Sequence, residues 1–383
     1  MDQIFDIFII GGGINGAGIA RDASGRGLKI FLAEKGKIGS ATSSWSTKLI
    51  HGGLRYLENY EFRLVRESLK ERDVISHIAP NITKPLPFVI PHTKKQRSQL
   101  MIRLGLFLYD NLGGKTKIPK SSKINLTKKY SNILKSNFLF GFQYFDIQVD
   151  DKKLVEMNID DAKKMGARVV ENKKVLNAYR VKGGWEITLD NNEIIKSKIL
   201  INAAGPWINE IINNVIKDNT NKKIRLVRGS HIIVKKLYDE EVAFTLQNDD
   251  NRIVFVIPYK EEYSLIGTTE VDVSSPDNPS ISDKEKKYLI NVINNHFVKQ
   301  ISQQDIIDTY SGIRPLIEDF KEASKVTRDY VFDLTLEDNT SPLLNIYGGK
   351  LTTYRKLSEK VIMELEPYLP IKKTKNWTHS KPL

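Results

Sequence analysis

The pattern of hydrophobic and polar residues predicts an α/β unit at the start of the chain. Residues 5–10 are mostly apolar and β-branched, which is typical of a buried parallel strand. A glycine-rich turn follows, a helix is expected over 17–25, and a second strand is expected over 29–33. These residues therefore predict a β-α-β unit.

The rest of the chain is predicted to contain both helices and short strands. Helices are expected over 60–78, 96–111, 149–164, 283–296 and 352–365. Strands are expected over 168–170, 175–181, 185–190, 194–201, 225–234, 252–258, 263–268 and 343–347. Four prolines between residues 80 and 91 are expected to break the chain after the helix at 60–78, and residues 115–137 are expected to be irregular.

The turn after the first strand, Gly11–Gly16, fits the G-x-G-x-x-G pattern of Rossmann-type dinucleotide-binding units. Gly11 permits the tight turn, Gly13 lets the backbone approach a pyrophosphate, and Gly16 lets the helix pack closely on the strand. Glu34 ends the second strand, where its carboxylate can accept the ribose hydroxyls and would repel a 2′-phosphate. The sequence therefore predicts an adenine dinucleotide other than NADP.

Two later features favour FAD over NAD. Residues 39–53 form a long polar loop at a point where NAD-binding domains usually continue with regular β-α-β units. Ala203, Ala204 and Gly205 form a small-residue turn after a strand, which would let the backbone come close to a flavin.

We expect an α/β fold with an added β-rich substrate domain. Segments 1–80, 145–215 and 340–365 are predicted to form a discontinuous FAD-binding domain. Segments 81–144 and 216–339 are predicted to form a substrate-binding or cap domain with a mixed β-sheet. Residues 366–383 are predicted to be a linker stub.

Composition narrows the chemistry. The chain has no cysteine, so disulfides, thiolate metal sites, cysteinyl flavin attachment and thiol catalysis are excluded, and its six histidines show no metal-ligand spacing. The net charge of +13 suits an anionic partner, yet no basic and aromatic module for nucleic acid is present. No signal peptide or spanning apolar run is evident, so a cytoplasmic protein, or one peripheral to the cytoplasmic membrane, is expected.

Three motifs carry a specific resemblance: Ser46–Glu58 (STKLIHGGLRYLE), Ser311–Leu316 (SGIRPL) and Gly348–Arg355 (GGKLTTYR). With the glycine loop, and with 263–270 and 327–330, they resemble FAD-dependent, respiratory glycerol-3-phosphate dehydrogenase. That family belongs to the D-amino-acid-oxidase-like, glutathione-reductase-like superfamily. The resemblance implies non-covalent FAD, oxidation of sn-glycerol 3-phosphate to dihydroxyacetone phosphate, and electron transfer to a ubiquinone-type acceptor. The family usually continues into a further helical domain, where this chain has only residues 366–383, and a homodimer is one expectation.

The same motifs supply the candidate site residues. A phosphate dianion calls for Arg and Lys, and the candidates for substrate binding are Arg55, Tyr56, Thr269, Arg314, Arg328 and Lys350. The catalytic candidates are His231 as proton acceptor, with His51 next, and Arg314 and Arg55 for charge stabilisation. The cofactor candidates are Gly11, Gly13, Ile14, Asn15, Gly16, Glu34, Lys35, Thr42, Ser43, Ser46, Thr47, Lys48, Leu49, His51, Gly52, Ala203, Ala204, Gly205, Gly312, Gly349, Lys350, Leu351 and Thr352.

Several alternatives remain open at this point. Residues 94–111 mix basic and apolar side chains, so they suit either an interfacial membrane helix or a helix packed on the protein's own core. The fold does not separate a dehydrogenase from an oxidase that uses O₂, nor from a flavin oxidase acting on an amino acid or amine. A nucleic-acid-associated flavoprotein and a non-catalytic flavin-binding remnant are the readings outside the enzyme class.

Overall fold

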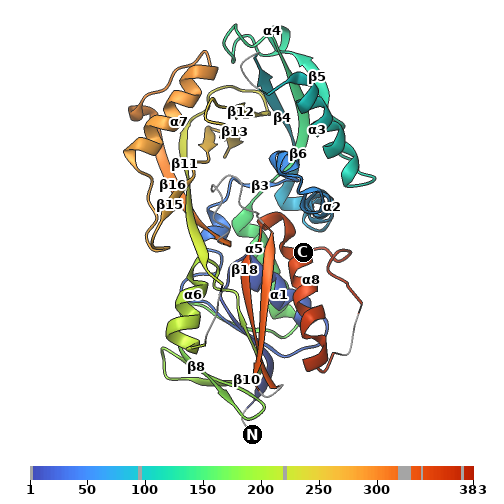
Figure 1. Cartoon of the computed structure of the whole chain (residues 1–383), viewed down its shortest axis with the longest axis vertical. Coiled ribbons are helices and arrows are strands. Elements are labelled where there is room, and N and C mark those ends of the chain that lie inside the picture. The colour runs from blue at the N-terminus through green and yellow to red at the C-terminus, as the bar shows by residue number, and fades with distance from the viewer. Residues whose placement is uncertain (1–2, 94–96, 219–221, 318–328, 338–339, 372–374) are drawn as a thin grey trace.

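The computed structural model describes residues 3–93, 97–218, 222–317, 329–337, 340–371 and 375–383. Two sheets lie one above the other along the length of the molecule (Figure 1). The helices are α1 (Ile14–Gly25), α2 (Phe62–Ile78), α3 (Gln99–Leu112), α4 (Leu126–Lys129), α5 (Asp151–Lys164), α6 (Ile208–Glu210), α7 (Asp283–His296) and α8 (Tyr354–Leu365).

The first sheet has the order β17-β18-β10-β1-β2-β7. Strands β18, β10, β1, β2 and β7 run parallel, β17 is antiparallel to β18, and the β8–β9 hairpin pairs with β10. Its strands are β1 (Ile4–Ile10), β2 (Ile30–Ala33), β7 (Arg168–Val170), β8 (Val175–Val181), β9 (Gly184–Leu189), β10 (Ile194–Asn202), β17 (Tyr330–Glu337) and β18 (Thr340–Gly348).

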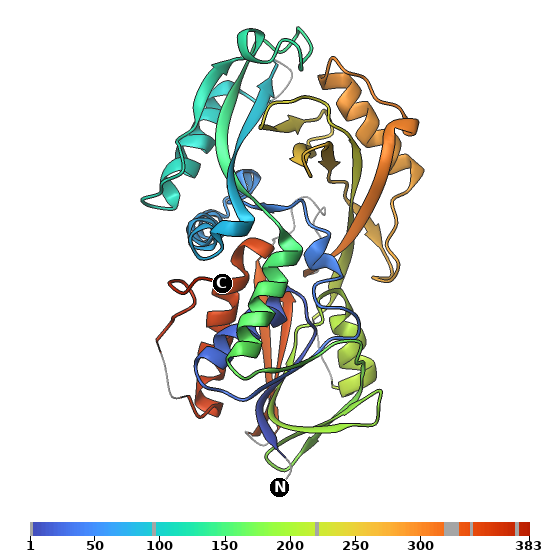
Figure 2. The same cartoon turned by 180° about the vertical axis from the view of Figure 1, so that it is seen from behind.

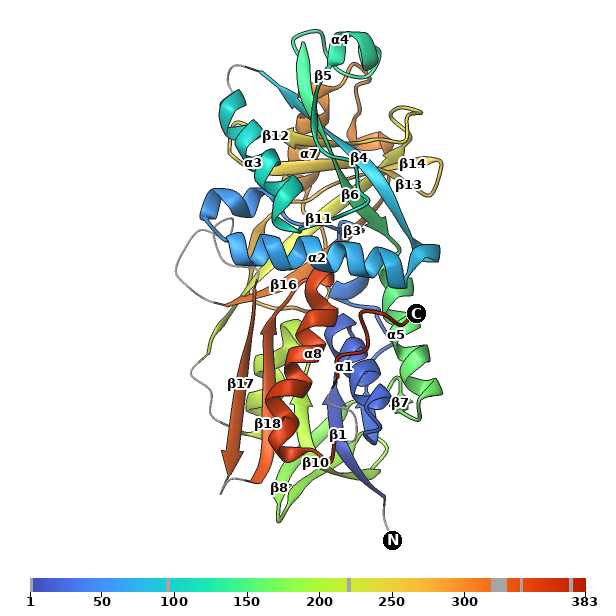
Figure 3. The ribbon, with the colours of Figure 1, turned by 90° about the vertical axis from the view of Figure 1, so that its right-hand side faces the viewer.

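This sheet is buried on both faces, which explains the apolar runs in its strands. Ile7 and Ile9 of β1 pack in one core with α1, α5 and α8. Phe8 and Ile10, which alternate with them, pack in a second core with the β8–β9 hairpin. The covering helices α1, α5 and α8 lie beside one another in the side view (Figure 3).

The second sheet has the order β15-β11-β14-β13-β12-β4-β6-β3, with β16 on β11 and β5 on β6. It is mixed, because β4 and β12 pair in parallel and the other pairs are antiparallel. Its strands are β3 (Leu49–Ile50), β4 (Thr83–His92), β5 (Ser122–Asn125), β6 (Phe140–Val149), β11 (Ile224–Lys235), β12 (Ala243–Gln247), β13 (Ile253–Tyr259), β14 (Tyr263–Gly267), β15 (Val271–Val273) and β16 (Ile306–Ile317). Helix α7 and the pair α2 and α3 lie on different sides of this sheet (Figure 2).

The structure corrects three local expectations. Residues 83–92 form strand β4 despite their prolines, and 122–129, within a stretch expected to be irregular, form β5 and α4. Pro85, Pro87 and Pro91 occupy alternate positions, so the N–H groups they lack would all point to one side, and the ladder with β6 runs through Thr83–His92. The helix expected from residue 149 begins at Asp151, because Val149 still belongs to β6.

Three segments cross the division drawn from the sequence, and one of them is residues 145–149 of β6, which lie in the second sheet. Residues 330–337 form β17 in the first sheet, and Leu49–Ile50 pair with β6 in the second. The first sheet therefore takes in residues expected in the cap, and the second takes in residues expected in the FAD-binding domain.

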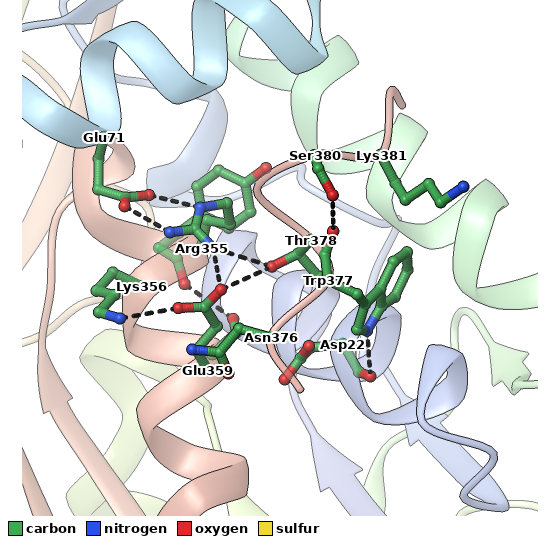
Figure 4. Close-up of polar contacts among 12 residues, drawn as sticks. Asp22, Glu71, Arg355, Lys356, Glu359, Asn376, Trp377, Thr378, Ser380 and Lys381 are labelled. Atoms are coloured by element: carbon green, nitrogen blue, oxygen red, sulfur yellow. Dashed lines mark hydrogen bonds and ion pairs between the residues drawn. The ribbon is translucent and has the colours of Figure 1, made fainter. Parts of the chain in front are cut away.

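Residues 375–383 pack against α1 and α8 (Figure 4). The Trp377 indole N–H donates to the Asp22 carbonyl, at 3.2 Å, and the ring covers Gly25 of α1. Beside it, the buried Arg355 guanidinium donates to both oxygens of Glu71 on α2, at 2.6 and 2.7 Å, and to Thr378 at 3.0 Å. This cluster ties α2 to α8 and to the last described segment.

Candidate active site

A cavity of about 1370 Å³ is lined by residues of both sheets and by the loops between them. The glycine loop lies on its wall at the carboxyl end of β1, where ligands bind in open α/β sheets. The cavity therefore joins the nucleotide-type region of the first sheet to a second region under the mixed sheet.

Close backbone contacts explain the glycines of the loop. Gly11 has φ +107°, and a Cβ there would lie 2.6 Å from the Ala203 carbonyl oxygen. A Cβ on Gly16 would lie 2.0 Å from the Gly11 carbonyl oxygen. Only glycine lets α1, β1 and the turn after β10 approach this closely.

The acidic residue predicted from spacing is fixed at the same wall. The Gly12 N–H donates to Glu34 at 2.6 Å, and the Gly36 N–H donates to the other carboxylate oxygen at 2.8 Å. Ile14 N–H, at the start of α1, donates to the Ser43 hydroxyl at 2.9 Å. Among the described residues, none forms a hydrogen bond with the buried Asn15 Oδ1, which fits a ligand group at this end of the helix.

The loop 42–50 is held from behind by Asp151, which is fully buried at the start of α5. Lys48 Nζ and the Ser46 hydroxyl each donate to this carboxylate at 2.6 Å. Burial raises the pKa of Asp151, although Lys48 and Ser46 act in the opposite direction. The side chains of Lys48 and Ser46 are therefore both engaged by Asp151. Thr42, Ser43, Ser46 and Thr47 line the cavity, and Lys48 does not.

Cationic and hydroxyl side chains gather on the second region of the wall. Arg55, Tyr56, Arg314 and Lys350 all line the cavity, and Lys350 Nζ lies 3.7 Å from the centre of the Tyr56 ring. Arg314 donates to the Thr268 hydroxyl at 3.1 Å. The structure therefore brings together side chains from three motifs that are far apart in the sequence.

His231 lies just behind this wall, on β11. It is 1% exposed, its ring stacks on Tyr310 with centroids 4.8 Å apart, and its Nε2 lies 3.1 Å from the Thr47 hydroxyl. Burial, with the charges of Arg314 and Lys48, holds the pKa of His231 well below its ordinary value. The imidazole is therefore neutral at physiological pH.

His51 lines the cavity itself. Burial and the charge of Lys350 lower its pKa to about 4. Its backbone N–H and carbonyl both bond to the Thr352 hydroxyl, at 3.2 and 3.3 Å, which joins the turn before Gly52 to the turn before α8. Both histidine candidates are thus neutral, but only His51 faces the cavity.

Most of the remaining cofactor candidates line the cavity. These are Gly11, Gly13, Ile14, Asn15, Glu34, Lys35, Leu49, Ala203, Ala204, Gly205, Gly312, Gly349, Lys350, Leu351 and Thr352. Gly16, Lys48, Gly52, Thr269 and His231 are absent from its lining and pack behind it. Arg328 lies outside the described residues.

Several buried residues that support the site were not found from the sequence. The Tyr109 hydroxyl accepts from the Gly52 N–H at 2.8 Å and donates to Asp146, which is paired with Arg72. Burial raises the pKa of Asp146 to about 6. Asp146 and Asp151 stand in no recognisable motif, so only the tertiary fold could reveal them, whereas Thr268 lies in the 263–270 segment that carries part of the resemblance.

The fold and the cavity define a class of protein: an α/β dinucleotide-binding protein in which a mixed sheet covers the ligand. A model of the FAD dependent oxidoreductase family, DAO, matches residues 6–355. The chain belongs to this family, and the predicted fold class and the FAD cofactor are confirmed.

The chain is also similar in sequence to curated relatives of known activity class. The chain is 47% identical over 372 residues to a glycerol-3-phosphate dehydrogenase of Pseudomonas aeruginosa, covering 96% of this chain and 72% of that protein. It is 44% identical over 386 residues to a D-erythritol 1-phosphate dehydrogenase of Brucella abortus, covering 99% of this chain and 76% of that protein. The resemblance to glycerol-3-phosphate dehydrogenases drawn from the motifs is confirmed.

A solved structure is similar throughout the chain. The glycerol-3-phosphate dehydrogenase of Bacillus halodurans, complexed with FAD, matches with a TM-score of 0.74 and 26% identity, covering 97% of this chain and 66% of that one. The chain therefore spans about two thirds to three quarters of the length of these relatives.

Proposed function

We propose that this protein oxidises the secondary hydroxyl of sn-glycerol 3-phosphate to give dihydroxyacetone phosphate, with non-covalent FAD as the oxidant. The observation that carries the proposal is the cavity itself, which joins a dinucleotide loop to a wall bearing Arg55, Arg314 and Lys350. An amino-acid or amine oxidase needs a carboxylate clamp but no site for a phosphate dianion. The named substrates of the two curated relatives are both phosphorylated polyols.

FAD would be held mainly by backbone groups. The loop at Gly11 and Gly13 and the N-terminus of α1 suit the pyrophosphate, and Glu34 suits the ribose hydroxyls. The hydroxyl-rich loop from Thr42 to Thr47 and the turn at Gly349 line the rest of this region. When bound, FAD supplies the hydride acceptor of the reaction.

The protein's part in the chemistry is to bind phosphate, orient the reacting carbon and receive a proton. Arg55, Arg314 and Lys350 are the proposed phosphate and oxyanion ligands, because guanidinium and ammonium groups make strong charge-assisted bonds to oxygen anions. Arg314 is held in place by Thr268, so it is preorganised to stabilise the negative charge that develops on the substrate oxygen. Tyr56, stacked beneath Lys350, can add a hydroxyl bond.

His231 is the proposed proton acceptor. It is neutral at physiological pH, as a proton acceptor must be. His231 itself does not line the cavity, but the Thr47 hydroxyl does, and it lies 3.1 Å from His231 Nε2. The proton of the substrate hydroxyl would therefore pass to Thr47 as Thr47 gives its own proton to His231 Nε2.

A turnover assay of the purified holoenzyme tests this function. With glycerol 3-phosphate and a soluble quinone analogue, we expect stoichiometric dihydroxyacetone phosphate and reduced quinone, and no turnover with glycine or sarcosine. Hydrogen peroxide as the main product would identify an oxidase instead. Turnover of glycine or sarcosine without turnover of the phosphate would overturn the proposal.

For the acceptor, we propose a ubiquinone-type molecule reached from an anionic membrane surface. Helix α3 exposes Leu100, Met101, Leu104 and Phe107 on one side, with exposed fractions of 56–78%. Tyr60 is exposed nearby, and with Met101 and Leu104 it also lines the cavity. Among the helices that the structure describes, none is long and apolar enough to cross a bilayer.

The charge beside this apolar face favours anionic lipid. Arg66 of α2 and Arg103 of α3 are exposed, Arg63 of α2 is exposed but paired with Asp329, and the whole chain carries a net charge of +13. We expect Leu104→Glu to lower sedimentation of the holoenzyme with phosphatidylglycerol vesicles. Ile194→Glu is the matched control, because Ile194 is exposed to a similar degree, 59% against 58%, on the first sheet. Equal sedimentation of both variants and the wild type would contradict membrane contact at α3.

A further inference from the structure

Glu285 is a buried carboxylate that has no part in the proposed chemistry, although it lies near the predicted catalytic residues. It lies at the third position of α7 and is 5% exposed. One of its oxygens, Oε2, accepts from the Ser282 N–H at 2.8 Å and from the Ser282 hydroxyl at 2.7 Å, which completes a capping box. Arg228 donates to the same oxygen at 2.5 Å.

The other oxygen has a different set of partners. Oε1 accepts from the Thr269 hydroxyl at 2.6 Å and from the Ser230 hydroxyl at 2.9 Å. The Thr269 hydroxyl in turn accepts from the Ser230 N–H at 3.0 Å, and the Ser230 and Ser311 hydroxyls lie 2.8 Å apart. The capping box uses only Oε2, so the bonds from Thr269 and Ser230 to Oε1 are additional to the helix cap.

These partners belong to the three segments that carry the reacting groups. Ser230 precedes His231 on β11, and Ser311 lies three residues before Arg314 on β16. Thr269 follows Thr268, whose hydroxyl accepts from Arg314 at 3.1 Å. Besides the backbone ladder between β11 and β16, one carboxylate therefore links the positions next to His231, which lies behind the cavity wall, and next to the Thr268 partner of Arg314, which lines the cavity.

The carboxylate is ionised when it does this. Burial raises the pKa of Glu285, but the hydrogen bonds from Thr269, Ser282 and Ser230 outweigh it, and the net pKa lies below its ordinary value. An ionised carboxylate is acceptor-only, so it sets the direction of each hydroxyl around it. The hydrogen of the Thr269 hydroxyl is directed to Glu285, away from any ligand in the cavity.

We propose that Glu285 is a positioning residue for the oxidation, holding His231 and Arg314 in register through Ser230, Ser311 and Thr269. In this arrangement Thr269 acts within the network and not by contact with the substrate. The proposal rests on the proposed function, because it assumes that His231 and Arg314 serve the same reaction.

The test is anaerobic stopped-flow reduction of the bound flavin by glycerol 3-phosphate in Glu285→Gln. The amide keeps the shape but places N–H donors where two hydroxyls or a guanidinium now donate. We expect the reduction rate at saturating substrate to fall by about tenfold to a hundredfold, the range in which misplaced catalytic groups act. FAD should stay bound, the apparent substrate affinity should change less than the rate, and substrate deuterated at C2 should give a larger isotope effect.

Two further variants separate positioning from helix capping. Ser282→Ala removes a bond only from Oε2, so it should lower thermal stability and keep the wild-type reduction rate. Ser230→Ala removes a bond only from Oε1, so it should slow reduction with the cap intact, and it keeps the test decisive if Glu285→Gln folds poorly. Wild-type rates in both Glu285→Gln and Ser230→Ala, or equal slowing in Ser282→Ala, would overturn the positioning role. A wild-type flavin that glycerol 3-phosphate does not reduce would instead overturn the proposed function, and the positioning role with it.

Discussion

Substituting alanine at Gly11 tests whether the close approach of the loop to β10 serves cofactor binding. The added Cβ would lie 2.6 Å from the Ala203 carbonyl oxygen and 2.9 Å from its carbon, on rigid backbone. The left-handed φ of +107° adds about 1–2 kcal/mol for an L-residue. Overpacking adds about 1–3 kcal/mol. Because the loop can relieve this only by moving off β10, we expect much of the roughly 2–5 kcal/mol to appear as lost FAD affinity.

That energy corresponds to a rise in the FAD dissociation constant of about thirtyfold or more, since 1.4 kcal/mol is tenfold. Titration of the deflavo-protein with FAD, followed by quenching of flavin fluorescence, measures it directly. Gly166→Ala is the matched control, because Gly166 has φ +95° but open space around its Cβ position. It should lower stability by about 1–2 kcal/mol and leave FAD affinity unchanged. Equal FAD affinity in the two variants would refute the reasoning.

Three further predictions concern ionisable side chains that are buried or line the cavity. Arg314→Lys should slow flavin reduction about tenfold to a hundredfold with FAD still bound, because it loses a charge-assisted bond; an unchanged rate would contradict this. Arg355→Met should lower the free energy of unfolding, measured in urea, by about 3–5 kcal/mol, because it leaves Glu71 buried and unpaired. Lys356→Met, at an accessible position, should lower the free energy of unfolding far less. Equal losses in the two variants would contradict the prediction. The pKa of His51 is about 4 in the folded protein, so the unfolded chain takes up a proton at His51 first as the pH is lowered. The free energy of unfolding should therefore fall as the pH is lowered from about 6.5 to about 4. In unfolding of the apoprotein, His51→Gln should make this pH dependence shallower, and an unchanged slope would contradict the prediction.

The parts of the fold that follow local rules could be predicted from the sequence. The β-α-β unit, the strand at 194–202 and helix α7 all carry continuous apolar patterns or terminal signals within a few residues. The glycine loop was predictable because its G-x-G-x-x-G pattern lies between a strand and a helix, although the close approach of Gly11 to Ala203 was not.

The parts that depend on distant partners were missed. Strand β4 forms despite three prolines because β6 supplies a complete ladder for it. Strand β17 joins the first sheet because β18 offers an antiparallel edge, which the local pattern does not reveal. Both cases are tertiary effects that override local preference.

The candidate site likewise has residues that could be predicted from the sequence and residues that only the structure reveals. Arg55, Arg314 and Lys350 stand in recognisable motifs, whereas Glu285 and Asp151 act through bonds to Ser230 and Ser46, which lie 55 and 105 positions away in the sequence. The sequence therefore indicates which side chains face a ligand, and the structure adds the buried carboxylates that hold them in place.

Anaerobic reduction of the bound flavin tests the central claim most directly, because it needs neither the natural acceptor nor a membrane. Holoenzyme mixed with sn-glycerol 3-phosphate should lose its visible flavin absorption at catalytically relevant rates, and dihydroxyacetone phosphate should form in equal amount. D-erythritol 1-phosphate is the informative comparison, since a relative at similar identity is named for it. If D-erythritol 1-phosphate reduces the flavin faster than glycerol 3-phosphate does, the preferred substrate is a different phosphorylated polyol and the class of reaction is unchanged. Flavin that stays oxidised with both phosphates would contradict the account.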